Sequence, residues 1–141
     1  MQPMLNIALR AARAAGEIIV RSMDRLDSLS VNEKDSKDYV TQVDQAAEKA
    51  IVNTILKAYP DHGIQGEEGT RVTGTGEGAD YLWVIDPLDG TREFSELDRD
   101  DWAVHVALWE SGVLVAGAVA LPAQNTTLHT PEVAAPRAVD G

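Results

Sequence analysis

Apolar residues recur at helical spacing in two stretches near the start of the chain. Over residues 3–25 they fall every three or four positions, which predicts an amphipathic helix with Pro3 in its first turn. A second helix is predicted over residues 41–59, because the same spacing returns there and Pro60 would end it. The polar residues 27–37 between them predict a loop. The predicted core positions of the second helix are Val43, Ala47, Ala50, Ile51 and Ile55.

Alternation between apolar and polar residues predicts strands in the rest of the chain. Residues 81–85 are apolar enough for a buried strand. Residues 102–109 and 113–121 predict two strands joined by a turn at residues 110–112. Residues 125–130 suit a further strand, so this part is expected to form an antiparallel meander.

Two shorter segments complete the predicted architecture. Residues 63–68 read as a short strand that ends in two acids, and the glycine-rich residues 71–80 read as a flexible connector. The fold class is therefore predicted as α+β, with two amphipathic helices packed on a mainly antiparallel sheet. Residues 1–130 are expected to form a single domain, and residues 131–141 a frayed tail.

Composition narrows the range of functions. The chain has 23 acidic and 12 basic residues and a formal net charge of −11. This excess of acids argues against a nucleic-acid surface or an anionic-membrane surface, since both need clustered lysine and arginine. Cysteine is absent, which excludes disulfides and thiolate chemistry and fits a reducing cytoplasm. No segment is apolar for long enough to span a bilayer.

The stretch from Trp83 to Thr91 is where chemistry is most expected. An apolar strand runs there into Asp86 and Asp89, two acids that a core would not accept without a positive partner. Gly90 allows a tight turn whose backbone N–H groups can face an anion. Two carboxylates beside an anion cradle predict Mg²⁺ holding a phosphate, although an isolated motif of this kind is more often an acidic surface turn.

Other polar residues have both a structural and a functional interpretation. Asp44, after Thr41, suits the capped start of the second helix. Glu67 and Glu68 could be a solvated turn; because neighbouring side chains on a strand point to opposite faces, Glu67 is the better ligand of the pair. The three histidines are interpreted as core, edge or loop residues rather than catalysts; they are His62, His105 and His129.

Three motifs in order give the chain a family resemblance. Asp38-Tyr-Val-Thr-Gln-Val-Asp44, Gly66-Glu-Glu68 and Trp83-Val-Ile-Asp-Pro-Leu-Asp-Gly-Thr91 resemble the inositol monophosphatase family of Mg²⁺-dependent, lithium-sensitive phosphatases. The resemblance implies the amino-terminal half of the layered sugar-phosphatase fold. It also implies two or three Mg²⁺ ions as cofactor, with a small phosphorylated molecule as substrate.

The resemblance assigns roles to particular residues. Glu67, Asp86 and the backbone carbonyl of Leu88 would hold the first Mg²⁺, and Asp86 and Asp89 would share a second. Glu67 would thereby be catalytic as well as a ligand, and Glu68 would lie behind the ligands without touching the ion.

The remaining implied roles concern the attacking water and the phosphate. Thr91, oriented by Asp44, would help to take a proton from the water that attacks the phosphate. The N–H groups of Gly90 and Thr91 would bind phosphate oxygens.

The resemblance divides along the chain. Residues 1–91 are similar to bacterial inositol-1-monophosphatases, whereas residues 91–122 are closer to the branch that hydrolyses 3′-phosphoadenosine 5′-phosphate. The family's later Trp-Asp motif, which completes a metal site, has no match after Leu121. We therefore weigh a phosphatase against a non-catalytic module that binds metal or a partner. An exposed sheet edge would then pair with a second copy of the chain or with a partner chain.

Overall fold

The computed structural model describes residues 2–28, 33–89, 103–121 and 126–131. Two long helices come first, and the elements after them are mainly strands. The elements are α1 (Gln2–Ser28), α2 (Glu33–Ala58), β1 (Gly63–Gly66), β2 (Arg71–Val72), the 3₁₀ helix η1 (Gly76–Asp80), β3 (Tyr81–Asp89), β4 (Ala103–Glu110), β5 (Val113–Leu121) and β6 (Thr126–His129).

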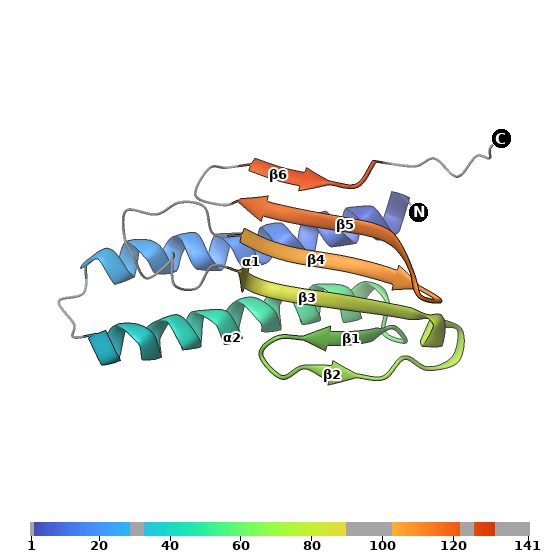
Figure 1. Ribbon diagram of the computed structural model, residues 1–141, viewed down its shortest axis with the longest axis horizontal. Helices are drawn as coiled ribbons and strands as arrows, with labels where there is room; N and C mark the ends of the chain where they lie inside the picture. Colours follow the sequence, from blue (N-terminus) through green and yellow to red (C-terminus); the bar gives the residue numbers. More distant parts are fainter. Residues whose placement is uncertain (1, 29–32, 90–102, 122–125, 132–141) are drawn as a thin grey trace.

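The six strands form one sheet in the order β2-β1-β3-β4-β5-β6 (Figure 1). β4 to β6 make the predicted antiparallel meander, β3 joins it as a further antiparallel strand, and β2 is antiparallel to β1. β1 instead runs parallel to β3, and Gly66 pairs with Ile85 near the end of β1. The carboxyl ends of β1 and β3 therefore lie at the same end of the sheet, which positions the candidate site.

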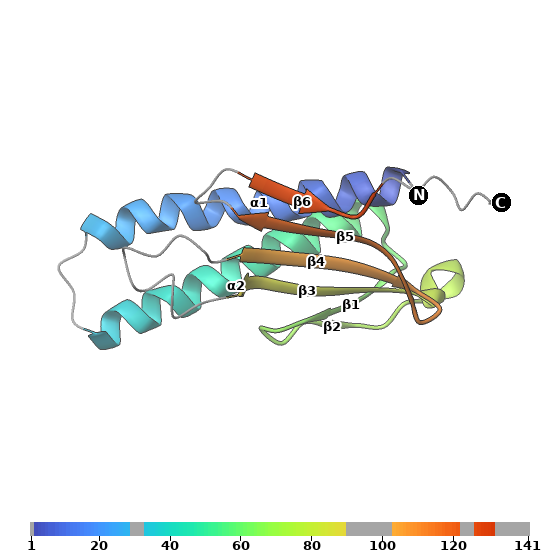
Figure 2. The ribbon, with the colours of Figure 1, turned by 45° about the horizontal axis from the view of Figure 1, so that its top comes forward.

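Both helices cover the same face of the sheet (Figures 1 and 2). α1 packs against β4 and β5, α2 packs against β3, and the two helices pack against each other. Small side chains in α1 permit this close approach, since Ala8, Ala11, Ala12 and Ala15 are fully buried. These observations confirm the predicted fold class. The largest fully buried side chains are Ile19, Ile51, Ile55, Ile64, Trp83, Ile85, Val104, Val106 and Leu108, together with Pro87.

The second helix begins earlier than the sequence predicts. α2 starts at Glu33 rather than near Thr41, so the predicted loop is wrong from residue 33 onward and Thr41 is not a helix cap. The physical reason lies in the packing between helices. Tyr39 lies against the core, and its hydroxyl donates a hydrogen bond to the Ser22 carbonyl of α1 at 3.3 Å. Contact with α1 thus supports a polar stretch whose own pattern does not show a helix.

Two further predictions need different corrections. The connector at residues 71–80 is not structureless, because it contains β2 and η1. The turn between β4 and β5 is confirmed, and its two central residues, Ser111 and Gly112, have φ of 49° and 83°. Positive φ at both positions is the geometry that joins tightly paired strands. The predicted tail lies outside the described residues, apart from Pro131.

Candidate active site

The turn after β1 lies beside the end of β3. The parallel register pairs Gly66 with Ile85, and the Glu67 N–H donates to the Ile85 carbonyl at 3.3 Å. Glu67 therefore follows its strand at the same level at which Asp86 follows Ile85. The chain thus brings two of the predicted ligands to neighbouring positions from segments that are well separated in sequence.

α2 contributes two more acids on its buried side. Asp44 is 7% exposed and Glu48 is 3% exposed. Their spacing of four residues puts them on the same face of the helix. They flank Ala47 and continue the buried row that begins at Val43. Acids are seldom buried in this way without hydrogen-bond donors or positive charges nearby, so both side chains are expected to have such partners.

Glu48 has those partners in the turn after β1. Its Oε1 accepts a hydrogen bond from the Glu68 N–H at 2.9 Å. Its Oε2 accepts one from the Thr70 N–H at 3.2 Å and one from the Thr70 hydroxyl at 2.6 Å. α2 and the turn are therefore joined through one buried carboxylate.

Asp44 lacks an equivalent set of partners among the described residues. Its Oδ1 is buried and accepts no hydrogen bond from that part of the chain. Burial raises the pKa of the Asp44 carboxyl from 3.8 to about 7, and nearby negative charges add to the effect. In decreasing order of effect, those charges belong to Glu68, Asp86, Glu48 and Glu67.

Glu68 belongs to the same cluster of charges. Burial raises its pKa, and the charges of Glu48, Glu67 and Asp86 raise it further. Glu68 is also the first of the charges that act on Asp44, ahead of Glu67. The five acids from α2, the turn after β1 and β3 therefore interact electrostatically, and we call them the acid cluster: Asp44, Glu48, Glu67, Glu68 and Asp86.

The end of β3 is described only in part. Asp86 pairs with His105 of β4, and the register shifts between Asp86 and Asp89. Of Leu88 and Asp89 the structure describes the backbone alone, as the last two residues of β3. The predicted phosphate-binding residues Gly90 and Thr91 lie outside the described residues. Their roles stay predictions.

The acid cluster suits a divalent cation in its chemistry. Carboxylate oxygens are the donors that Mg²⁺ prefers, and a cation would relieve the repulsion that raises the pKa of Asp44. Among the described side chains, no three acids or histidines converge closely enough to enclose an ion on their own. The Asp89 carboxylate is not among these side chains, and the predicted ligand set stays a prediction.

The sequence interpretation missed Glu48. Its signal is present in the sequence, since an acid four residues after Asp44 continues a row of core positions and therefore needs a buried partner. The partner itself could not be predicted, because the contact joins residues more than twenty positions apart.

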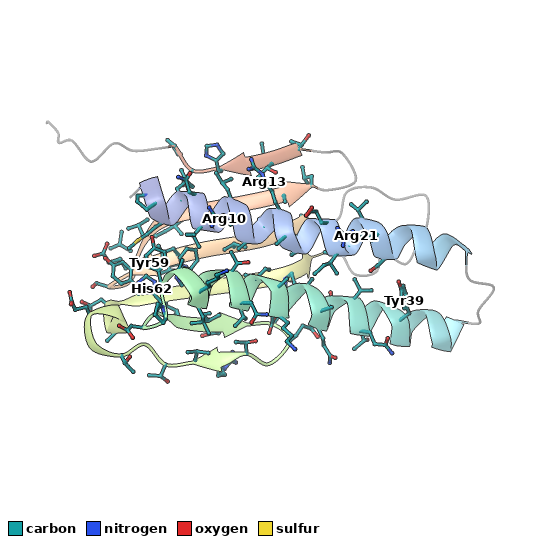
Figure 3. All side chains as sticks on the ribbon, turned by 180° about the vertical axis from the view of Figure 1, so that it is seen from behind. Arg10, Arg13, Arg21, Tyr39, Tyr59 and His62 are labelled. Carbon is teal, nitrogen blue, oxygen red and sulfur yellow. The ribbon has the colours of Figure 1, made fainter. Side chains whose placement is uncertain are left out.

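His62 is a second residue whose surroundings the sequence does not reveal. It is 5% exposed and stacks between Tyr59 and Tyr81, with ring centroids 4.5 and 4.4 Å away. Tyr59 and His62 lie together at the end of α2 (Figure 3). The Trp83 indole donates to His62 Nδ1 at 2.9 Å. The imidazole is therefore a packing element, as the sequence interpretation favoured.

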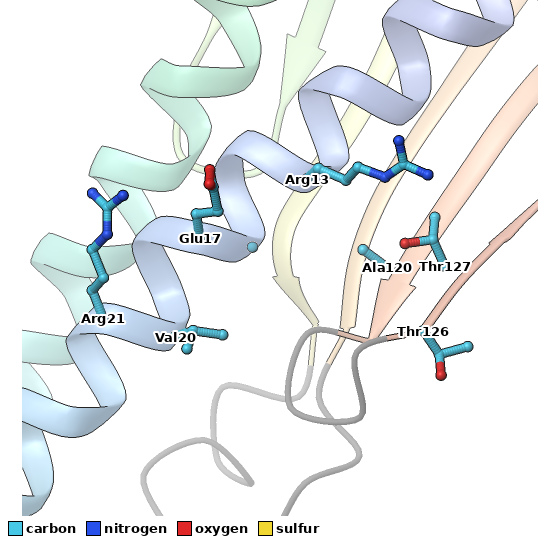
Figure 4. A pocket seen from close by; sticks show the side chains of 8 residues that line it. Arg13, Glu17, Val20, Arg21, Ala120, Thr126 and Thr127 are labelled. Carbon is cyan, nitrogen blue, oxygen red and sulfur yellow. The ribbon is translucent and has the colours of Figure 1, made fainter.

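A pocket of about 730 Å³ lies elsewhere, between α1 and the edge formed by β5 and β6 (Figure 4). Arg13, Glu17 and Arg21 of α1 line the pocket, and the Arg13 side chain extends toward Thr127 of β6. None of the residues that line the pocket belongs to the acid cluster, so we do not assign the predicted chemistry to it.

Among the described residues, neither helix is long and apolar enough to cross a membrane.

Comparison with known proteins places the fold among inositol monophosphatases. The extragenic suppressor protein SuhB of Bartonella henselae superimposes with a TM-score of 0.78 at 34% identity, covering 92% of this chain and 49% of that one. Inositol monophosphatase II of Staphylococcus aureus gives a TM-score of 0.75 at 28% identity, covering 92% of this chain and 46% of that one.

Sequence comparison gives the same assignment. Nus factor SuhB of Pseudomonas aeruginosa is 72% identical over 94 residues, which make up 67% of this chain and 35% of that protein. The chain thus spans less than half the length of these relatives. The model of the inositol monophosphatase family matches residues 1–134. The chain belongs to the inositol monophosphatase family.

Proposed function

We propose that this chain supplies the amino-terminal part of a Mg²⁺-dependent phosphate monoester hydrolase, with inositol-1-phosphate as the preferred substrate. The observation that carries the proposal is the acid cluster, in which carboxylates from three separate segments interact electrostatically with Asp44, a buried acid whose Oδ1 accepts no hydrogen bond from the described residues. Such an arrangement is costly without a positive partner, and a divalent cation with a bound phosphate would provide one.

Each predicted ligand has a role in this proposal. Glu67 follows Gly66 of β1, and Asp86 follows Ile85, the residue of β3 that pairs with Gly66. These two acids would hold one Mg²⁺ together with the Leu88 carbonyl. Asp86 would share a second ion with Asp89. When bound, the ions would neutralise phosphate charge and stabilise the leaving oxygen. The carboxylates fix where that positive charge sits relative to the substrate.

Asp44 would orient the group that handles the proton. Its buried Oδ1 is an acceptor to which the Thr91 hydroxyl could donate, which would aim Thr91 at the attacking water. The N–H groups of Gly90 and Thr91 would bind phosphate oxygens. Glu68 would act on the ligands through its charge, without touching an ion.

Two alternatives rest on specific observations. Residues 91–122 resemble the 3′-phosphoadenosine 5′-phosphate branch, which makes that nucleotide the second substrate to test. The similarity to a protein named as a Nus factor favours a partner-binding module with little turnover.

Phosphate release tests the proposal. The chain is incubated with inositol-1-phosphate or 3′-phosphoadenosine 5′-phosphate, with and without Mg²⁺. Asp86→Asn removes a shared ligand, and Asp80→Asn, at an exposed position in η1, is the matched control. We expect Mg²⁺-dependent release that Asp86→Asn abolishes and Asp80→Asn retains.

Mg²⁺ binding by itself separates the alternatives. A chain that binds Mg²⁺ through Asp86 but releases no phosphate would be a metal-binding module, and its melting temperature should still rise with Mg²⁺. If Mg²⁺ leaves both phosphate release and melting temperature unchanged, the metal site is wrong.

A further inference from the structure

Glu48 joins two parts of the fold that the proposed metal site depends on. It lies inside the contact between α2 and the turn at residues 66–70, with 3% of its surface exposed. Three donors reach its two carboxylate oxygens: the Glu68 N–H, the Thr70 N–H and the Thr70 hydroxyl. Hydrogen bonds to an ionised acceptor are stronger than neutral ones, so the carboxylate holds the turn firmly.

Two hydrogen bonds within the turn help to close it. The Gly66 N–H donates to the Thr70 carbonyl at 3.0 Å, and the Gly69 N–H donates to the Gly66 carbonyl at 3.4 Å. Gly69 has a φ of 104°, a conformation that other residues adopt only with strain. Without Glu48, the backbone N–H groups of Glu68 and Thr70 would lose the acceptor that α2 gives them.

Gly66 shows how closely the carboxylate fits. A Cβ atom at this position would lie 2.5 Å from Cδ and Oε2 of Glu48, well inside van der Waals contact. β1 therefore ends in a glycine, Gly66, at the point where the Glu48 carboxylate packs against the turn. The backbone of the turn is built around Glu48.

Glu67 lies in the middle of this arrangement. Its own N–H is bound to the Ile85 carbonyl of β3, and the next N–H, that of Glu68, is bound to Glu48. Its backbone is thereby fixed against β3 on one side and against α2 on the other.

We propose that Glu48 is a positioning residue, which fixes the backbone of Glu67 so that the Glu67 carboxylate is presented to Mg²⁺. Glu48 itself would not touch the ion. This role rests on the proposed function. It extends that function to a residue of α2 whose partners are all in the turn.

Isothermal titration with Mg²⁺ tests the role, at a temperature at which circular dichroism shows each variant to be folded. Glu48→Gln keeps the shape but places an NH₂ group where an acceptor is needed. We expect it to weaken Mg²⁺ binding roughly tenfold or more, the usual cost of losing a partner that orients a ligand. Glu17→Gln, the same change at an exposed position in α1, should bind as the unmodified chain does.

A second pair of variants separates positioning from charge, because Glu48→Gln also removes a negative charge near the ion. Thr70→Val removes the hydroxyl that donates at 2.6 Å, whereas Thr70→Ser keeps a hydroxyl there. Neither substitution changes the charge. We expect Thr70→Val to weaken Mg²⁺ binding severalfold and Thr70→Ser to bind Mg²⁺ nearly as the unmodified chain does. This pair also serves if Glu48→Gln does not fold.

The outcomes distinguish this role from the proposed function. If Glu67→Gln weakens Mg²⁺ binding while Glu48→Gln and Thr70→Val bind as the unmodified chain does, Glu48 is only a structural residue and the positioning role is wrong. If the unmodified chain binds no Mg²⁺ at millimolar concentration, or Glu67→Gln binds it equally well, the proposed function fails and this role fails with it.

Discussion

Replacing Asp44 with asparagine should change how the stability of the metal-free protein depends on pH. Asp44 is buried in the acid cluster, and its pKa in the folded chain is about 7, against 3.8 for an ordinary aspartate. Between these two values the folded chain binds a proton that the unfolded chain has lost. The stability that this proton provides is complete below pH 3.8 and is lost as the pH rises through about 7.

The size of the effect follows from the two pKa values. A difference of one in pKa corresponds to about 1.4 kcal/mol. Ionising Asp44 in the folded chain therefore costs about 4 kcal/mol more than ionising it in the unfolded chain. Roughly half of this, about 2 kcal/mol, should be lost between about pH 5.5 and pH 8.5. That interval lies above the sequence pI of about 4.5, where the chain carries net negative charge.

Urea denaturation followed by circular dichroism measures this, with a chelator present. Asp44→Asn is neutral at every pH, so its free energy of unfolding should rise relative to that of the unmodified chain by about 2 kcal/mol over that interval. Glu77→Gln, at an exposed position in η1 at the other end of β3, is the matched control and should follow the unmodified chain. Added Mg²⁺ should reduce the Asp44→Asn difference, because a cation favours the ionised acid.

Parallel stability curves for Asp44→Asn and the unmodified chain would refute this reasoning. They would mean that Asp44 is not in the repulsive, buried environment that the acid cluster implies. A difference of the opposite sign, with the variant losing stability as the pH rises, would mean that a positive partner holds Asp44 ionised.

Four further variants test the packing of the fold. Burial lowers the pKa of His62 below 6.5, so the free energy of unfolding decreases as the pH falls below that value. Between about pH 7.5 and pH 5.5, urea denaturation should show a smaller decrease for His62→Phe than for the unmodified chain. Ile51→Ala should lower the free energy of unfolding by about 2–5 kcal/mol because it empties a fully buried position, and a loss well under about 1 kcal/mol in urea denaturation would contradict the assigned core. Gly78→Ala would place a Cβ 2.2 Å from the Asp61 carbonyl oxygen and should cost more than about 1 kcal/mol, whereas Gly117→Ala, with 3.6 Å to its nearest neighbour, should melt at nearly the same temperature as the unmodified chain.

The sequence predicts the parts of the fold whose pattern is local. The hairpin at Ser111 and Gly112 and the apolar rows of both helices depend on neighbouring residues, and the structure confirms the hairpin and most of the helix positions. Ala50 is the exception in α2, because it is only half-buried whereas Val43, Ala47, Ile51 and Ile55 are buried. The start of α2 is different. Residues 33–40 show no apolar period, and their helix is supported by contacts with α1 such as the one from Tyr39. A single sequence does not display that kind of support.

The residues of the candidate site also fall into those that the sequence reveals and those that it does not. Asp44, Glu67 and Asp86 stand out in the sequence through the three family motifs, and the structure brings their charges together. The role of Glu48 was hidden, because its partners lie in a different segment and an acid on a helix is usually a solvated residue. Glu67 as a metal ligand in preference to Glu68 stays a prediction, and the structure adds that the charge of Glu68 acts more strongly than that of Glu67 on the pKa of Asp44.

The parallel pairing of β1 with β3 has a consequence for folding. Every member of the acid cluster lies between Asp44 and Asp86, and the hydrogen bonds that join α2 to the turn after β1 span 20 and 22 residues of chain. Contacts over short sequence separations form early, since closing a short loop loses little entropy. The β4–β5 hairpin closes over Ser111 and Gly112 alone, whereas Glu67 has to reach Ile85 and Thr70 has to reach Glu48. Hydrogen exchange during refolding should therefore protect the strand amides of β5 before the Glu67 and Thr70 amides.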